Sequence, residues 1–147
     1  MENLEGIYIL NAQGQLIFSY EISEDPREKF DYANVSRFFS VIKTFALKIG
    51  EKEAKIVELG KSKIFKTADY DLNIEFIIKC EKTVKEKKAS NYLNDLINLF
   101  TNNFIGYFNS SDSIKKKRMD SFIEKFNLIF GTEGKINYFI RHLKIST

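Results

Sequence analysis

The most constraining feature of the sequence is a short uncharged run, residues 6–10, near the start of the chain. A turn-forming segment at 11–14 and a second strand-like segment at 15–22 follow it. Asn11 at the first turn position and Gly14 at the fourth suit a tight turn, because Gly accepts a positive φ. Alternate side chains of a strand point to opposite faces, so the first strand is apolar on both faces and needs cover on both. The hairpin therefore predicts a sheet with helices on both faces and this strand near its middle.

Size and composition are those of a soluble globular domain. The 147 residues, with 44% hydrophobic and 29% charged, are enough for one domain with a substantial core. The formal net charge of +3 is too small to imply a nucleic-acid partner. A single cysteine excludes an internal disulfide and fits a reducing compartment. No signal peptide, lipid-anchor motif or stretch of roughly 20 apolar residues is recognisable, so a cytoplasmic location is expected.

An amphipathic helix and three strands are predicted in the middle of the chain. Apolar residues recur at helical spacing from Val35 to Ile49, and Gly50 ends the pattern. Strand-like segments follow at 54–59, 63–67 and 72–81, joined by connections so short that they must be hairpins. The last segment alternates polar and apolar residues and places Cys80 on its apolar face.

The remainder of the chain predicts helices. A second helix starting near Ser90 is apolar over about half its circumference, which requires contact with both a sheet and a neighbouring helix. The neighbour is a third helix with an apolar face from Met119 to Phe130. A short C-terminal helix is predicted around Lys135–Leu143, because helical offsets relate Ile136, Phe139, Ile140 and Leu143.

The sequence offers no recognisable catalytic or metal-binding motif. Cys80 and His142 are the only residues of their types, so neither a Cys/His pair nor a four-ligand zinc site can be assembled. Cys80 is interpreted as a buried core side chain and His142 as a surface or interface residue. Gly60-Lys61-Ser62 ends like a P-loop, but Lys55 occupies the place of its first Gly and a strand follows. No catalytic activity, cofactor or metal is therefore expected.

Two surface features are candidates for partner contacts. The basic run Lys115, Lys116, Lys117 and Arg118 is either a contact for anionic lipid headgroups or an acidic partner, or a solvated helix face. On the first predicted helix, Leu47 projects from the polar side and Val41 borders the apolar stripe. Together with the edge of the three-stranded meander, these two residues suggest an interface.

The order strand–strand–helix–strand–strand–strand–helix–helix resembles that of the longin domain. The hairpin from Gly6 to Ser19 is similar to the first hairpin of longin-type trafficking subunits, and residues 38–50 with 56–65 look like small archaeal longin-like proteins. The related roadblock fold begins with an extra helix, whereas the first strand here starts at about residue 5.

The resemblance covers about residues 4–130 and implies an α+β fold. The expected fold is a five-stranded antiparallel sheet with the first helix on one face and the later two on the other. The chain is then a single domain, 1–147, with a C-terminal helical extension at about 131–147.

What the resemblance implies is a non-enzymatic interaction module that scaffolds or regulates a small Ras-like GTPase in trafficking-type machinery. It would act as a homodimer, or with another longin or roadblock subunit. Longin domains commonly dimerise through the first helix and third strand, which places the contact at Val41, Lys43, Leu47, Lys55, Val57 and Leu59. Two alternatives stay open: a small-ligand sensor of PAS or profilin-like type with a pocket between sheet and helix, and a peripheral membrane adaptor that uses the basic run.

Overall fold

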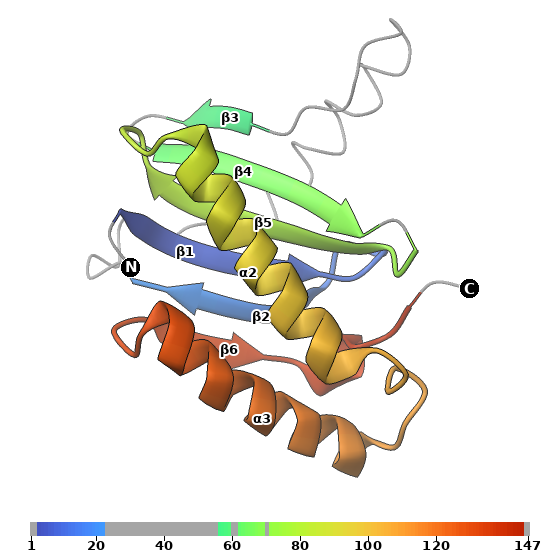
Figure 1. Cartoon of the computed structure of the whole chain (residues 1–147). Helices are drawn as coiled ribbons and strands as arrows, with labels where there is room; N and C mark the ends of the chain where they lie inside the picture. Colours follow the sequence, from blue (N-terminus) through green and yellow to red (C-terminus); the bar gives the residue numbers. More distant parts are fainter. Residues whose placement is uncertain (1–2, 23–55, 60–61, 70, 146–147) are drawn as a thin grey trace, which may run out of the picture.

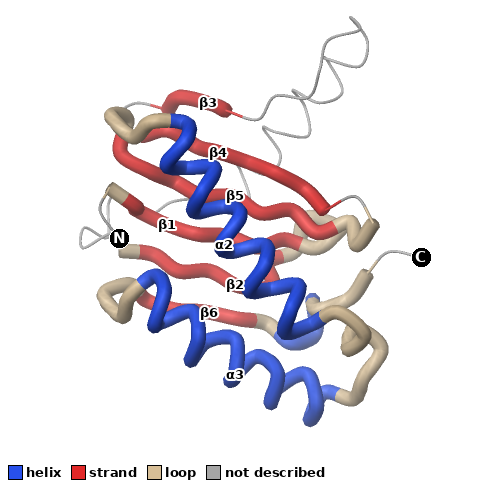
Figure 2. The backbone as a smooth tube through the Cα atoms, viewed as in Figure 1, coloured by secondary structure: helices blue, strands red, loops and turns tan. Residues whose placement is uncertain are grey.

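A computed structural model of the chain describes residues 3–22, 56–59, 62–69 and 71–145. Its elements are β1 (Leu4–Leu10), β2 (Leu16–Glu21), β3 (Ile56–Leu59), β4 (Ser62–Asp69), β5 (Ile74–Glu81), α2 (Glu86–Phe104), α3 (Asp112–Phe130), β6 (Lys135–Tyr138) and the 3₁₀ turn η2 (Ile140–His142). The strands form one antiparallel sheet in the order β3-β4-β5-β1-β2-β6. Helices α2 and α3 lie side by side on one face of it (Figures 1 and 2).

This arrangement confirms the α+β class, the five predicted strands and the placement of the two later helices on one face. The first predicted helix, residues 35–49, was expected to cover the opposite face. It lies outside the residues that the structure describes.

Strand β1 is central, as the opening hairpin predicts, and pairs with both β2 and β5. Ile7 and Ile9 are fully buried in the core under α2 and α3, whereas Tyr8 and Leu10 belong to a second buried cluster on the other face. The turn after β1 closes where the amide of Gly14, with φ 75°, donates to the Asn11 carbonyl at 2.9 Å. A strand that is apolar on both faces is therefore confirmed.

Phenylalanine rings fill the core between the sheet and its two helices. Phe18 of β2 packs edge to face on Phe122 and Phe126 of α3, with ring centroids 5.1 and 4.9 Å away. Phe76 of β5 packs in the same way on Phe100 of α2, at 5.5 Å. Phe100 and Phe122 meet across the two helices at 5.9 Å. The wide apolar face of α2 thus packs against both the sheet and α3, as the sequence predicts.

The C-terminal segment differs from the prediction. The prediction of a helix around Lys135–Leu143 is wrong, because Lys135–Tyr138 forms the strand β6. Only the 3₁₀ turn Ile140–His142 is helical in this segment. This strand extends the sheet beyond β2, and the amide of Phe139 donates to the Ile17 carbonyl at 2.9 Å. The physical reason is that, without β6, β2 would leave a row of backbone groups unpaired at the sheet edge.

The side chains of β6 also suit a strand. Ile136 and Tyr138, two residues apart, both pack against the core under α3. Gly134 precedes β6 where the chain passes directly over Tyr20, and a Cβ at Gly134 would lie 2.5 Å from that ring. Glycine therefore permits the close approach that brings β6 alongside β2.

Candidate partner-binding surfaces

The predicted partner-binding residues are divided between the described and the undescribed parts of the chain. Outside the described residues lie Val41, Lys43, Leu47 and Lys55. Val57 and Leu59 belong to β3, which lies at one end of the described sheet. There they stand opposite Ile64 and Ser62 of β4. The structure thus places two of the six residues on a terminal strand.

The basic run does not form one cationic face. Consecutive helical residues point about 100° apart, so the four side chains are spread around the first turns of α3. Lys116 forms an ion pair with Asp120 at 2.6 Å and lies over the Tyr138 ring of β6, 5.3 Å from its centroid. The Asp120 carboxylate and then Tyr138 raise the pKa of Lys116 above its ordinary value.

Arg118 of the same run is engaged as well. Its guanidinium lies over the ring of Tyr107 at 3.7 Å from the centroid and donates a hydrogen bond to the hydroxyl of that tyrosine. Two of the four cations therefore hold α3 to β6 and to the α2–α3 connection. Lys115 is half-buried and Lys117 is exposed.

Cys80 and His142, the two side chains best suited to nucleophilic or metal chemistry, are both packed against the rest of the fold. Cys80 is fully buried, and burial, followed by the nearby Glu5 carboxylate, raises the pKa of its thiol to about 12. This confirms Cys80 as a core side chain that stays protonated at neutral pH. His142 is half-buried, with Nδ1 2.6 Å from the Leu16 carbonyl oxygen.

Asn11 completes the attachment of the C-terminal segment. It is 1% exposed, its Nδ2 donates to the His142 carbonyl at 3.0 Å, and its Oδ1 accepts from the amides of Gln13 and Gln15. Sequence reasoning assigned Asn11 to the turn alone. No local pattern signals a bond between residues 131 positions apart.

The described residues form neither a P-loop nor a cluster of side chains that could hold a metal ion. Strand β4 follows residues 60–61 directly, where a P-loop requires a helix. Among the residues that the structure describes, no three His, Cys, Asp or Glu side chains gather as a metal site requires. In the same part of the chain, no helix is both long and apolar enough to cross a membrane.

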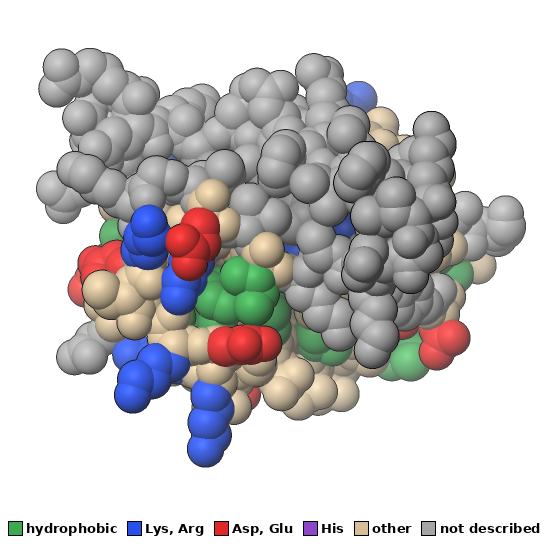
Figure 3. Space-filling model, turned by 90° about the horizontal axis from the view of Figure 1, so that it is seen from above, with side chains coloured by type: hydrophobic (Ala, Val, Ile, Leu, Met, Phe, Trp, Pro, Cys, Tyr) green, Lys and Arg blue, Asp and Glu red, His purple; other side chains and the backbone are tan. Residues whose placement is uncertain are grey.

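A pocket of about 200 Å³ lies between the first half of α2 and strands β3 and β4. Its floor is apolar and consists of Ile56, Phe65 and Leu93. Ile56 and Phe65 stand opposite each other in β3 and β4, so both side chains are on the face that carries α2. Phe65 and Leu93 are buried, whereas Ile56 is 39% exposed. Seen from the β3 side, hydrophobic side chains form a small surface patch bordered by acidic and basic ones (Figure 3).

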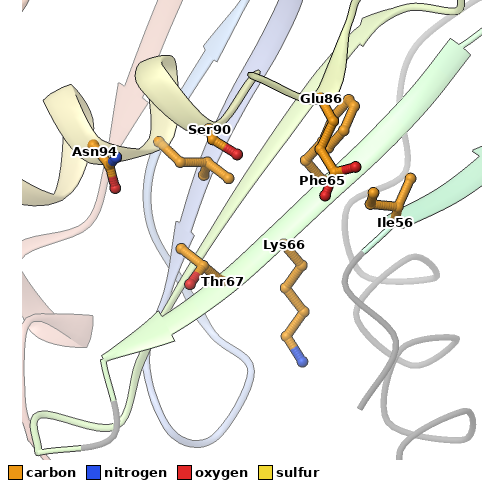
Figure 4. A pocket seen from close by; sticks show the side chains of 8 residues that line it. Ile56, Phe65, Lys66, Thr67, Glu86, Ser90 and Asn94 are labelled. Atoms are coloured by element: carbon orange, nitrogen blue, oxygen red, sulfur yellow. The ribbon is translucent and has the colours of Figure 1, made fainter. Parts of the chain in front are cut away.

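The walls of the pocket are polar. Glu86, Ser90 and Asn94 line it from α2, and Thr67 lines it from β4. Figure 4 shows the Glu86 carboxylate beside Phe65 and Ile56, and the Ser90 hydroxyl directed away from α2 toward the sheet. No sequence motif singles out these lining residues, because the pocket forms only where α2 crosses the β3–β4 hairpin.

The strand order and the position of the two later helices define a longin-like α+β fold, extended by the sixth strand β6. No protein-family model matches the chain, and the comparison with curated proteins gives no match either. A solved structure, Myxococcus xanthus MglB, is similar with a TM-score of 0.42 and 18% sequence identity, covering 65% of this chain and 84% of that one.

Proposed function

We propose that the protein is a non-enzymatic longin-like interaction module that binds a small Ras-like GTPase and scaffolds or regulates it. The observation that carries the proposal is the sheet order β3-β4-β5-β1-β2 with α2 and α3 following β5 on one face. Because one fold hosts many functions, this is a fold-level analogy, and the contact surface has to be tested directly. Pairing with itself or with another longin or roadblock subunit, in trafficking-type machinery, belongs to the same proposal.

The proposed contact surface comprises the first predicted helix and the terminal strand β3. Val41, Lys43 and Leu47 supply the helix part, and the segment from Lys55 to Leu59 supplies the strand part. Support comes from the sheet topology, which leaves β3 at one end of the described sheet. A terminal strand presents unpaired backbone groups, which a partner strand can complete.

The two alternatives gain less support. A ligand sensor requires an enclosed pocket, whereas Glu86, Ser90 and Asn94 in the pocket wall are exposed. The volume of about 200 Å³ is also below the roughly 300–1,000 Å³ of typical ligand pockets. A membrane adaptor requires a concentrated basic face, whereas Lys116 and Arg118 are engaged with Asp120 and Tyr107.

The test is a binding measurement with the purified small GTPases of the source organism, each loaded with GDP or with a non-hydrolysable GTP analogue. We expect one of them to bind in one nucleotide state, by calorimetry and by co-elution in size-exclusion chromatography. Leu47→Glu should weaken that binding at least tenfold, which corresponds to about 1.4 kcal/mol and is typical of one interface residue.

Leu128→Glu is the matched control, because Leu128 is 84% exposed on α3, an element that the proposed surface does not include. It should leave binding unchanged. A monomeric protein that binds none of the GTPases in either nucleotide state would contradict the proposal. Equal weakening by both variants would place the contact elsewhere.

A further inference from the structure

The pocket between α2 and β4 combines an apolar floor with hydrogen-bond acceptors on its walls. Glu86, Ser90 and Asn94 are four residues apart, so they line one side of α2 at steps of about 6 Å along its axis. Thr67 faces them from β4. A carboxylate accepts hydrogen bonds only, and the two hydroxyls and the amide oxygen accept them as well. Four acceptors therefore surround the apolar surface of the floor.

The charge available to a bound group is negative. No ion pair joins Glu86 to another residue that the structure describes. Lys66, the cation among the lining residues, has its ammonium 3.4 Å from the Glu75 carboxylate. Lys88 lies two residues beyond Glu86, about 200° around the helix, and is placed over the Tyr92 ring instead.

We propose that this pocket receives an arginine side chain from a protein partner. The apolar stem would cover Ile56 and Phe65, while the guanidinium would donate to the Glu86 carboxylate and to the neighbouring Ser90 and Thr67 oxygens. The volume of about 200 Å³ suits one side chain rather than a drug-sized ligand. Insertion removes the exposed surface of Ile56 from water and gives Glu86 a charged donor, which makes a stronger hydrogen bond than a neutral one.

Other side chains match the pocket less well. An aliphatic side chain would cover the floor but would leave the acceptors without donors, which is unfavourable for groups removed from water. A carboxylate or phosphate would be repelled by Glu86. Lysine brings a single ammonium, whereas the planar guanidinium of arginine offers five N–H donors and stacks on aromatic rings such as Phe65. The partner that supplies this arginine need not be a GTPase.

The experiment titrates the ¹⁵N-labelled full chain with the capped pentapeptide acetyl-Gly-Gly-Arg-Gly-Gly-amide and follows its amide signals by NMR. We expect the backbone signals of Thr67, Glu86 and Ser90 and the side-chain amide of Asn94 to shift together. The expected dissociation constant is on the order of 1–10 mM, as befits one side chain. The same peptide with citrulline, which is neutral but of similar shape, should bind about tenfold more weakly.

Two variants locate the binding. Glu86→Gln removes the charge from an exposed side chain and should weaken binding of the arginine peptide about tenfold. Glu124→Gln removes an exposed charge from α3 and should have no effect. The proposal is overturned if the citrulline peptide binds equally well, if Glu86→Gln changes nothing, or if the shifts occur outside the pocket. Equal binding of a lysine peptide would overturn the assignment to arginine.

Discussion

Phe122 joins the sheet to both helices, and its removal should cost more stability than that of any exposed residue of α3. Its side chain is fully buried, and its ring centroid lies 5.1 Å from Phe18, 5.9 Å from Phe100 and 5.8 Å from both Phe104 and Phe126. Because these partners belong to β2, α2 and α3, the cavity left by Phe122→Ala cannot close by moving one element alone. We expect the free energy of unfolding to fall by about 3–5 kcal/mol.

The assay is urea unfolding followed by far-UV circular dichroism, since the chain has no Trp to serve as a fluorescent probe. For a chain of 147 residues the entropy of unfolding is about 0.3 kcal/mol per kelvin, so Tm should fall by about 10–15 °C. Leu128→Ala, on the same helix but 84% exposed, should change the stability by at most about 0.5 kcal/mol. A loss below about 2 kcal/mol for Phe122→Ala, or equal losses for the two variants, would refute the proposed packing.

Three further outcomes follow from individual contacts. Asn11→Ala should lower the unfolding free energy by about 2–3 kcal/mol in urea titrations, because the buried side-chain amide forms hydrogen bonds with both its own turn and the His142 carbonyl. Ala12→Ser, at an exposed position, is the control. Equal stability of the two variants would contradict the role of Asn11. Gly134→Ala should cost about 1–3 kcal/mol, because the new Cβ would meet the fully buried Tyr20 ring, whereas Thr132→Ala at an exposed neighbour should be neutral. Cys80 should react with a thiol reagent at pH 8 only as fast as the protein opens, because its pKa is raised to about 12 by burial, and rapid labelling of the native protein would disprove this.

The raised pKa of Cys80 also makes the stability of the protein depend on pH. The native state keeps the thiol proton over a range in which the unfolded chain, with a pKa near 9, has lost it. The native state therefore binds more protons there, and the contribution of Cys80 to stability is complete below about pH 9 and decreases between about pH 9 and pH 12. The pH dependence of a Cys80→Ala variant should be flatter in that range, as urea titrations can show.

Local pattern determined much of this fold. The apolar run 6–10 predicted a central strand covered on both faces, and Ile7 and Tyr8 indeed enter different buried clusters. The alternation after residue 72 placed Cys80 in the core, and the breadth of the apolar face of α2 required a second helix beside it. These features could be predicted because side-chain period and turn chemistry act over a few neighbouring residues.

Only the tertiary structure decided the rest. The apolar spacing of Ile136, Phe139, Ile140 and Leu143 fits a helix, but residues 135–138 pair with the edge of β2 as a strand that places Tyr138 opposite Phe18. The basic run 115–118 looks like one charged patch in the sequence, yet Lys116 contacts Asp120 and Tyr138, whereas Arg118 contacts Tyr107. The pocket behind the proposed arginine contact exists because α2 crosses the β3–β4 hairpin. Each outcome depends on residues brought together from distant parts of the chain, and local periodicity carries no information about such contacts.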